Sequence, residues 1–239
     1  MKTFKRILIG LAIVLVALVG WGLAEPYFID TEEYRAEIPN LPAAWEGKRF
    51  AQISDWQLGM WMDNESTVRR SVERLVEARP AFVLISGDFI YHAEDDPDGT
   101  IRKVVEMARP LPEAGIPTFA VLGNHDYAMR KKGGTADEQL ARRLEEALEE
   151  AGIDVLQNEV QVLPAEADGP AGDTSSAPLY LVGIGANWPG KDRPREAVAA
   201  VPEGAARIVM MHNPNSYEAL PAGTAPLAVA GHTHGGQIS

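Results

Sequence analysis

The chain has 239 residues, 46% of them hydrophobic, which favours one substantial domain with a short appendage. It has no cysteine, so disulfides, thiolate zinc sites and a cysteine nucleophile are excluded, and any metal must be bound by His, Asp, Glu, Asn or Gln. The 34 acidic and 22 basic residues give a net charge of -12, which argues against binding to a nucleic-acid polymer. An acidic protein that binds phosphate would need metal ions to make its site positive.

The N-terminus predicts a membrane segment. Residues 7–24 carry no charge and follow Lys2, Lys5 and Arg6. As a helix rising about 1.5 Å per residue, this run would be about 27 Å long, close to the thickness of a bilayer core. Basic residues before the run and acidic residues after it predict a cytoplasmic N-terminus and a single-pass anchor with an extracytoplasmic domain.

A cleaved signal peptide is the alternative interpretation of this segment. Gly22-Leu23-Ala24 has the small-x-small pattern of a cleavage site, and cleavage would give a secreted protein. The length of the apolar run and the proline just beyond it favour an uncleaved anchor. We therefore expect an anchor or signal over residues 1–24, an extended, proline-containing linker over 25–47, and one domain over 48–239.

The first half of the domain alternates apolar strands with helices. The strands are expected at residues 49–54, 81–86 and 117–122, and the helices around 68–76, 101–108 and 135–151. Thr135 with Glu138 fits a capping box at the start of the last of these helices. This alternation predicts parallel strands covered by helices.

The second half is expected to contain further strands around one loop. The strand-like runs cover residues 154–163, 179–184, 207–211 and 227–230, with a short helix at 195–200. Residues 165–177 are rich in Ala, Gly, Pro, Ser and Asp without periodicity, so we interpret them as a mobile surface loop.

Five of the expected strands end in side chains that can bind a metal. These ends carry Asp55, Asp88, Asn124 with His125, His212, and His232 with His234. Each alone has an ordinary explanation, because Asp and Asn are common in turns and caps. Together they are significant, since the carboxyl ends of parallel strands meet in one crevice. His92 does not end a strand, and we interpret it as a loop residue.

The motifs at these ends resemble the signature of the calcineurin-like metallophosphoesterases. They are Asp55-Trp56-Gln57, Gly87-Asp88, Gly123-Asn124-His125-Asp126, His212, and Gly231-His232-Thr233-His234. The resemblance covers about residues 48 to 237. The His-Asn-Pro and Gly-His-Thr-His-Gly-Gly-Gln stretches are most similar to the membrane-associated bacterial branch that includes the YkuE- and YaeI-type phosphodiesterases. This implies an α/β sandwich of two mixed sheets flanked by helices and preceded by one N-terminal transmembrane helix.

The resemblance also implies a site for two divalent metal ions, either Mn, Fe, Zn or Mg, with Mn favoured. The first ion would be held by Asp55, Asp88 and His234, and Asp88 would bridge to a second ion held by Asn124, His212 and His232. Two such cations can generate a hydroxide, bridging between them, at neutral pH and can neutralise phosphate oxygens. His125 would then approach the leaving-group oxygen as general acid, or would stabilise its charge. Asp126 would orient His125, or would be a solvated acid.

Two features depart from the family pattern. Gln57 stands where the first motif of the family has His, and an amide oxygen is less suited than imidazole to zinc. We therefore expect Gln57 to give a first metal site that is weaker or biased towards Mn²⁺ or Mg²⁺. The sequence also stops at Ser239, shortly after His234, whereas the family continues through further strands, so the domain is expected to be truncated or its second sheet short.

The sequence thus predicts a membrane-anchored, metal-dependent phosphoester hydrolase, acting as a phosphodiesterase, pyrophosphatase or phosphomonoesterase. Its location suggests a lipid or cell-envelope phosphoester as substrate. The alternative is a catalytically weakened metal-binding or scaffold protein of the envelope, because of Gln57 and the missing C-terminal strands.

Overall fold

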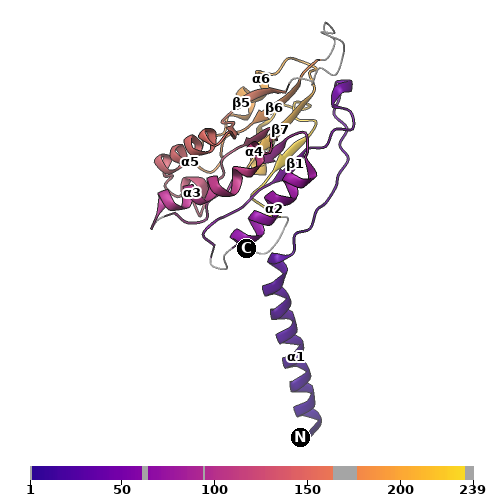
Figure 1. Cartoon of the computed structure of the whole chain (residues 1–239), viewed down its shortest axis with the longest axis vertical. Helices are drawn as coiled ribbons and strands as arrows, with labels where there is room; N and C mark the ends of the chain where they lie inside the picture. Colours follow the sequence, from indigo (N-terminus) through magenta and orange to yellow (C-terminus); the bar gives the residue numbers. More distant parts are fainter. Residues whose placement is uncertain (1, 61–63, 94, 164–176, 235–239) are drawn as a thin grey trace.

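Two four-stranded sheets form the centre of the domain in the computed structural model, which describes residues 2–60, 64–93, 95–163 and 177–234 (Figure 1). The first sheet has the order β1 (Ala51–Ile53), β2 (Val83–Ile85), β3 (Thr118–Ala120), β4 (Asp154–Val155), and the second has the order β5 (Glu159–Leu163), β6 (Leu179–Gly183), β7 (Arg207–Met211), β8 (Ala228–Ala230). The expected α/β sandwich of two sheets flanked by helices is confirmed.

The two sheets differ in strand direction. All neighbouring strands of the first sheet are parallel, so only the second sheet, in which β5 runs antiparallel to β6, is mixed. The first sheet is parallel because each of its connections contains a helix that returns the chain to the same edge. The loop expected at residues 165–177 lies, apart from Ala177, outside the described residues.

One expected strand is in fact two strands. The run over residues 154–163 breaks between β4 and β5, and the chain passes there from the first sheet to the second. Asn158 adopts the left-handed conformation at this break, with φ 65°. Its side-chain oxygen accepts hydrogen bonds from the backbone N–H groups of Gly185 and Arg193, which holds the turn against the neighbouring loop.

Helices cover both outer faces of the sandwich. They are α2 (Glu65–Ala78), α3 (Pro97–Ala108), α4 (Pro110–Glu113) and α5 (Glu138–Glu150) on the first sheet, α6 (Pro194–Ala199) on the second, and the short 3-10 helices η1 (Glu25–Tyr27), η2 (Ala43–Trp45), η3 (His125–Tyr127) and η4 (Pro214–Ala219). The capping box expected at Thr135 is wrong. Asp137 is the N-cap of α5 instead, and its carboxylate accepts from the N–H groups of Gln139 and Leu140.

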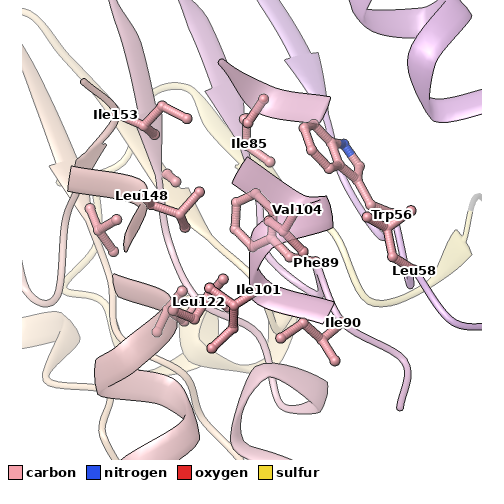
Figure 2. Packing of buried hydrophobic residues seen from close by; sticks show 14 of the residues in the cluster. Trp56, Leu58, Ile85, Phe89, Ile90, Ile101, Val104, Leu122, Leu148 and Ile153 are labelled. Carbon is pink, nitrogen blue, oxygen red and sulfur yellow. The ribbon is translucent and has the colours of Figure 1, made fainter. Parts of the chain in front are cut away.

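The strands bury alternate residues on opposite faces. In β2, Val83 and Ile85 pack under the helices, whereas Leu84 packs between the sheets (Figure 2 shows the cluster under the helices). In β7, Met210 packs between the sheets and Val209 packs beneath α6. The result is a four-layer arrangement in which the central strands β2, β3 and β7 are buried on both faces, and the loops at the strand ends carry polar groups.

An apolar helix precedes the domain. Helix α1 (Lys2–Ala24) contains a span, Thr3–Ala24, with mean hydropathy 2.7 and none of its surface buried, and it extends away from the domain (Figure 1). Its length and composition suit a membrane span, and a signal sequence has the same properties.

The segment that follows α1 contacts the domain along part of its length. The carbonyl oxygens of Tyr27 and Ile29 accept hydrogen bonds of 2.7 and 2.9 Å from Arg70 and Arg74 of α2. Further on, Ile38, Leu41 and Trp45 pack against the core between the two sheets. The segment that directly follows α1 is therefore bound to α2.

Candidate metal centre

The strand ends of both sheets bring the expected ligands together. Asp55, Asp88 and Asn124 follow β1, β2 and β3, while His212 follows β7 and His232 and His234 follow β8. The backbone N–H of His232 lies 3.1 Å from both carboxylate oxygens of Asp55, which joins the last strand of one sheet to the first strand of the other. The convergence expected from the sequence is thus present in the structure.

Three side chains form what we call the Asp88 cluster: Asp88, His212 and His232. One potential ligand atom of each lies within 4.8 Å of those of the others. His212 Nε2 is 3.1 Å from Asp88 Oδ2, and the rings of His212 and His232 meet edge to face with centroids 5.2 Å apart. Asp88 and His212 are fully buried, so the cluster concentrates metal-binding groups in a site shielded from water.

His212 is arranged as a metal ligand. Its Nδ1 lies 2.7 Å from the carbonyl oxygen of Ser86, so Nδ1 carries the proton and Nε2 points into the cluster. Nε2 is buried and has no partner of hydrogen-bond geometry, although it lies at ion-pair distance from Asp88. A histidine that uses one nitrogen to bind a carbonyl and leaves the other bare is typical of metal sites. The donor set therefore fits a divalent cation.

The charges of Asp88 and His212 stabilise each other. Burial alone would lower the pKa of His212, but the neighbouring Asp88 carboxylate outweighs it and raises the pKa to about 9. Burial would likewise raise the pKa of Asp88, yet His212 and the N–H of His125 hold it below its usual range. In its charged form His212 carries a proton on Nε2, facing Asp88. A cation would compete with this proton for Nε2.

A second group, the Gln57 cluster, contains Asp55, Gln57 and His234. Gln57 is buried, and its Nε2 lies 3.0 Å from Nε2 of His234, which is itself 3.5 Å from Asp55 Oδ1. The amide of Gln57 therefore donates to the nitrogen that would bind a metal. An imidazole at position 57 could bind the cation directly, whereas this amide must turn to present its oxygen.

The expected ligands have unusual backbone conformations. Nine non-glycine residues of the described chain have positive φ, and five of them are Asp55, Gln57, Asp88, His232 and His234, with φ between 44° and 70°. Such conformations cost free energy in residues with a side chain and gather at functional sites. The strain is thus concentrated in both clusters.

Two glycines permit the close approach of the loops. A Cβ atom on Gly123 would lie 2.1 Å from Asp88 Oδ1, and one on Gly231 would lie 2.0 Å from Ser54 Oγ. Any larger residue would displace these groups, so the glycines of the Gly-Asn-His-Asp and Gly-His-Thr-His motifs are required by packing at the site.

Comparison with known proteins agrees with this geometry. The family model described as calcineurin-like phosphoesterase matches residues 48–236. The chain belongs to the calcineurin-like phosphoesterase family. Members of this family hydrolyse phosphate esters with divalent metal ions, and both clusters lie inside the matched region.

Several bacterial members of the calcineurin-like phosphoesterase family are similar to this chain. Phosphodiesterase YaeI of Escherichia coli is 33% identical over 163 residues, which are 68% of this chain and 52% of YaeI. The metallophosphoesterase YkuE of Bacillus subtilis is 27% identical over 94% of this chain and 72% of its own length. LpxG of Chlamydia muridarum, a UDP-2,3-diacylglucosamine pyrophosphatase, is 24% identical over 95% of this chain and 77% of its own length. The expected similarity to YkuE and YaeI is confirmed, and the chain spans about half the length of YaeI.

His125 lies beside Asp88 and is half-buried. Its backbone N–H donates a 2.8 Å hydrogen bond to Asp88 Oδ1. Its ring stacks on Tyr91, with centroids 5.3 Å apart, and Nδ1 lies 3.4 Å from the carbonyl oxygen of Tyr91. The sequence did not indicate Tyr91, because nothing in its spacing marks it as a neighbour of His125.

Asp126 has a different environment from the one expected. It is fully buried, so the solvated-acid interpretation is wrong. Its carboxylate accepts hydrogen bonds of 2.8 to 3.1 Å from the backbone N–H groups of Asp88, Phe89, Ile90 and Gly123. Burial and the charge of Asp88 raise the pKa of Asp126 to about 7, against the effect of these donors. The contacts that the structure describes for Asp126 position the loops after β2 and β3 rather than the ring of His125.

Asn124 and two further residues complete the surroundings of the Asp88 cluster. The amide nitrogen of Asn124 donates to the carbonyl oxygen of Met129 at 2.9 Å, so its Oδ1 is the atom available to a cation. The side-chain nitrogen of Asn213, the residue after His212, donates a 3.4 Å hydrogen bond to that oxygen. The ring of Trp188 packs edge to face on His232 at 4.9 Å. Asn213 belongs to the His-Asn-Pro stretch, and nothing in its residue type or spacing indicated this contact.

Proposed function

We propose that this protein is a membrane-anchored phosphoester hydrolase that uses two divalent cations, with a phosphodiester or diphosphate as substrate. The observation that carries the proposal is the convergence of Asp88, His212 and His232, in which the buried Nε2 of His212 lies 3.1 Å from Asp88. A cation bound between these side chains would be ligated by all three, while the Nδ1 of His212 keeps its hydrogen bond to the carbonyl oxygen of Ser86.

The two clusters divide the ligands between the two proposed cations. The Gln57 cluster would hold one cation and His212, His232 and Asn124 the other, with Asp88 shared between them. Cations bound there would neutralise phosphate oxygens and make a hydroxide available at neutral pH. Manganese suits the mixture of carboxylate, amide and imidazole donors.

His125 would act on the leaving group. Its ring is fixed by stacking on Tyr91, and its backbone is fixed by the hydrogen bond to Asp88. A proton on its ring would pass to the oxygen that leaves phosphorus, or would stabilise the negative charge that develops there. Asp126 would contribute by keeping the Asp88 and Asn124 loops in register, since it bonds to the N–H groups of both.

A lipid or cell-envelope phosphoester is the substrate class that we favour. Asn64, which precedes α2, donates to the carbonyl oxygens of Trp56 and Gln57 in the first metal motif. Arg70, which donates to the carbonyl oxygen of Tyr27 just after α1, lies about 9 Å further along α2 at 1.5 Å per residue. This spacing supports a site close to the membrane surface. The similarity to LpxG, whose name describes a lipid diphosphate as its substrate, supports the same class.

Hydrolysis and metal content test the proposal together. Full-length protein with Mn²⁺ should hydrolyse p-nitrophenyl phosphate or its bis ester, and should contain two equivalents of metal by elemental analysis. His232→Ala and His234→Ala should each reduce the content to about one equivalent, because the two histidines belong to different clusters. No turnover and no bound metal would contradict the proposal, whereas bound metal without turnover would favour the scaffold alternative.

A further inference from the structure

A pocket of about 390 Å³ lies beside His125 and outside both ligand clusters. Its walls come from the loop after β2, the loop that carries His125, and the first turns of α5. The residues that matter for its chemistry are Tyr91, His92, His125, Arg130, Asp137 and Arg143. Its volume falls within the range of small-molecule sites, towards the small end.

Two arginines line the pocket in a protein whose net charge is -12. Arg130 contacts Nδ1 of His92, and Arg143 forms an ion pair with Asp98 of α3. The carboxylate of Asp137 is the acid on the wall, and it accepts hydrogen bonds from the start of α5. The lining thus includes two arginines and one carboxylate, and Asp98, which lies outside the lining, is the ion partner of Arg143.

The pocket lies against His125, the residue proposed to act on the leaving group. His125 and Tyr91, whose rings stack on each other, line the pocket directly. If His125 serves the leaving-group oxygen, this pocket is the described cavity into which the rest of the leaving group would extend. A guanidinium group can bind two phosphate oxygens at once through charge-assisted hydrogen bonds.

We propose that this pocket is the leaving-group subsite and that Arg130 and Arg143 select leaving groups bearing a second anionic group, as in a diphosphate diester. The inference rests on the proposed function and names its substrate class. In the reaction the oxygen of water bonds to one phosphorus and the bond from that phosphorus to the bridging oxygen breaks. The bridging oxygen leaves as part of one phosphate monoester, the attacked half becomes a second, and each takes one proton of the water. A phosphate monoester is a weak base and leaves readily without a proton. It therefore depends more on stabilisation of its negative charge than on a general acid.

The test compares two substrates that differ in the charge of the leaving group. P1,P2-diphenyl diphosphate releases phenyl phosphate, whereas bis(p-nitrophenyl) phosphate releases a phenol. In Arg130→Gln and Arg143→Gln, the ratio of kcat/KM for the diphosphate to that for the bis ester should fall about tenfold or more from its wild-type value. The inhibition constant of phenyl phosphate should rise in the same variants.

Two variants serve as matched controls. Asp98→Asn removes the ion partner of Arg143 but keeps the guanidinium, and Arg142→Gln removes the neighbouring exposed charge of α5. Neither should lower the ratio. An unchanged ratio in both pocket variants, or an equal fall in Arg142→Gln, would overturn the subsite while leaving the hydrolase intact. Failure of the wild type to hydrolyse either substrate would instead contradict the proposed function, and the subsite would fall with it.

Discussion

At the scale of single residues, the centre depends on side chains held in costly conformations. Asp55, Gln57, Asp88, His232 and His234 all have left-handed backbones, and each follows the end of a strand. Backbone hydrogen bonds hold these turns, such as that from the Gln57 N–H to the carbonyl oxygen of Asp88 at 2.9 Å. The strain is tolerated because neighbouring strand ends fix one another.

Gln57 gives the sharpest prediction at this scale. Its amide nitrogen now donates to His234 Nε2, so a metal must displace that hydrogen bond before it can bind. Gln57→His removes the competing donor and adds an imidazole ligand, so affinity at the first site should rise about tenfold or more, with preference moving towards zinc. Metal content and activity across Mn²⁺, Mg²⁺ and Zn²⁺ measure both effects. Equal metal content and an unchanged order of metals would refute this reading of Gln57.

At the scale of elements, Asp126 joins two loops of the first sheet. It accepts from three consecutive N–H groups after β2 and from Gly123 after β3. These donors lie where regular strand pairing has ended, so they need another acceptor. One buried carboxylate thus fixes the spacing of the loops that carry Asp88 and Asn124.

Asp126→Asn tests this role. The amide has one oxygen instead of two and places an NH₂ group against backbone donors, so at least one buried N–H loses its acceptor. The free energy of unfolding should fall by about 1–3 kcal/mol in urea. Asp137→Asn is the matched control, because Asn caps a helix nearly as well as Asp and should change stability little. An equal loss of stability in the two variants would contradict the role of the Asp126 carboxylate in fixing the two loops.

The elements themselves were largely predictable, and their termini were less so. Apolar runs and helical periodicity indicated β1 to β3, α2, α3 and α5, because these elements bury continuous faces. The sheet switch near Asn158 was missed, since a left-handed turn inside an apolar run has no periodic signal. The capping error had a local cause: Thr135 and Asp137 are both good caps, and tertiary packing decides between them.

The candidate site was predictable for a different reason. Ligand types at strand ends are visible in the sequence, and the convergence of parallel strands brings them together. The partners of those ligands were not visible. Ser86 acts through its backbone carbonyl, Asp126 binds only backbone groups, and Tyr91 stacks on His125 from another loop. Such contacts depend on tertiary geometry rather than on residue type.

At the scale of the whole molecule, the segment that follows α1 is bound to the same helix that borders the proposed site. Arg70 and Arg74 hold the carbonyl oxygens of Tyr27 and Ile29, and Asn64 links the start of the same helix to the first metal motif. Helix α2 therefore connects the proposed anchor to the proposed site. If the anchor spans a bilayer, this connection limits how far the site can move from the lipid surface.

The double variant Arg70→Gln, Arg74→Gln should remove the hydrogen bonds between α2 and the segment after α1. It should leave the proposed metal ligands unchanged. The full-length double variant in phosphatidylglycerol vesicles should hydrolyse hexadecyl p-nitrophenyl phosphate, a lipid-like diester held in the bilayer, several-fold more slowly than the wild type. Its rate with soluble bis(p-nitrophenyl) phosphate should stay unchanged, because a flexible tether lowers only the effective concentration of the site at the membrane. Arg69→Gln, on the same helix, is the control. Equal rates on the vesicle substrate would mean that the docking of the anchor has no part in substrate access, and an equal slowing on both substrates would place the defect in the fold of the domain.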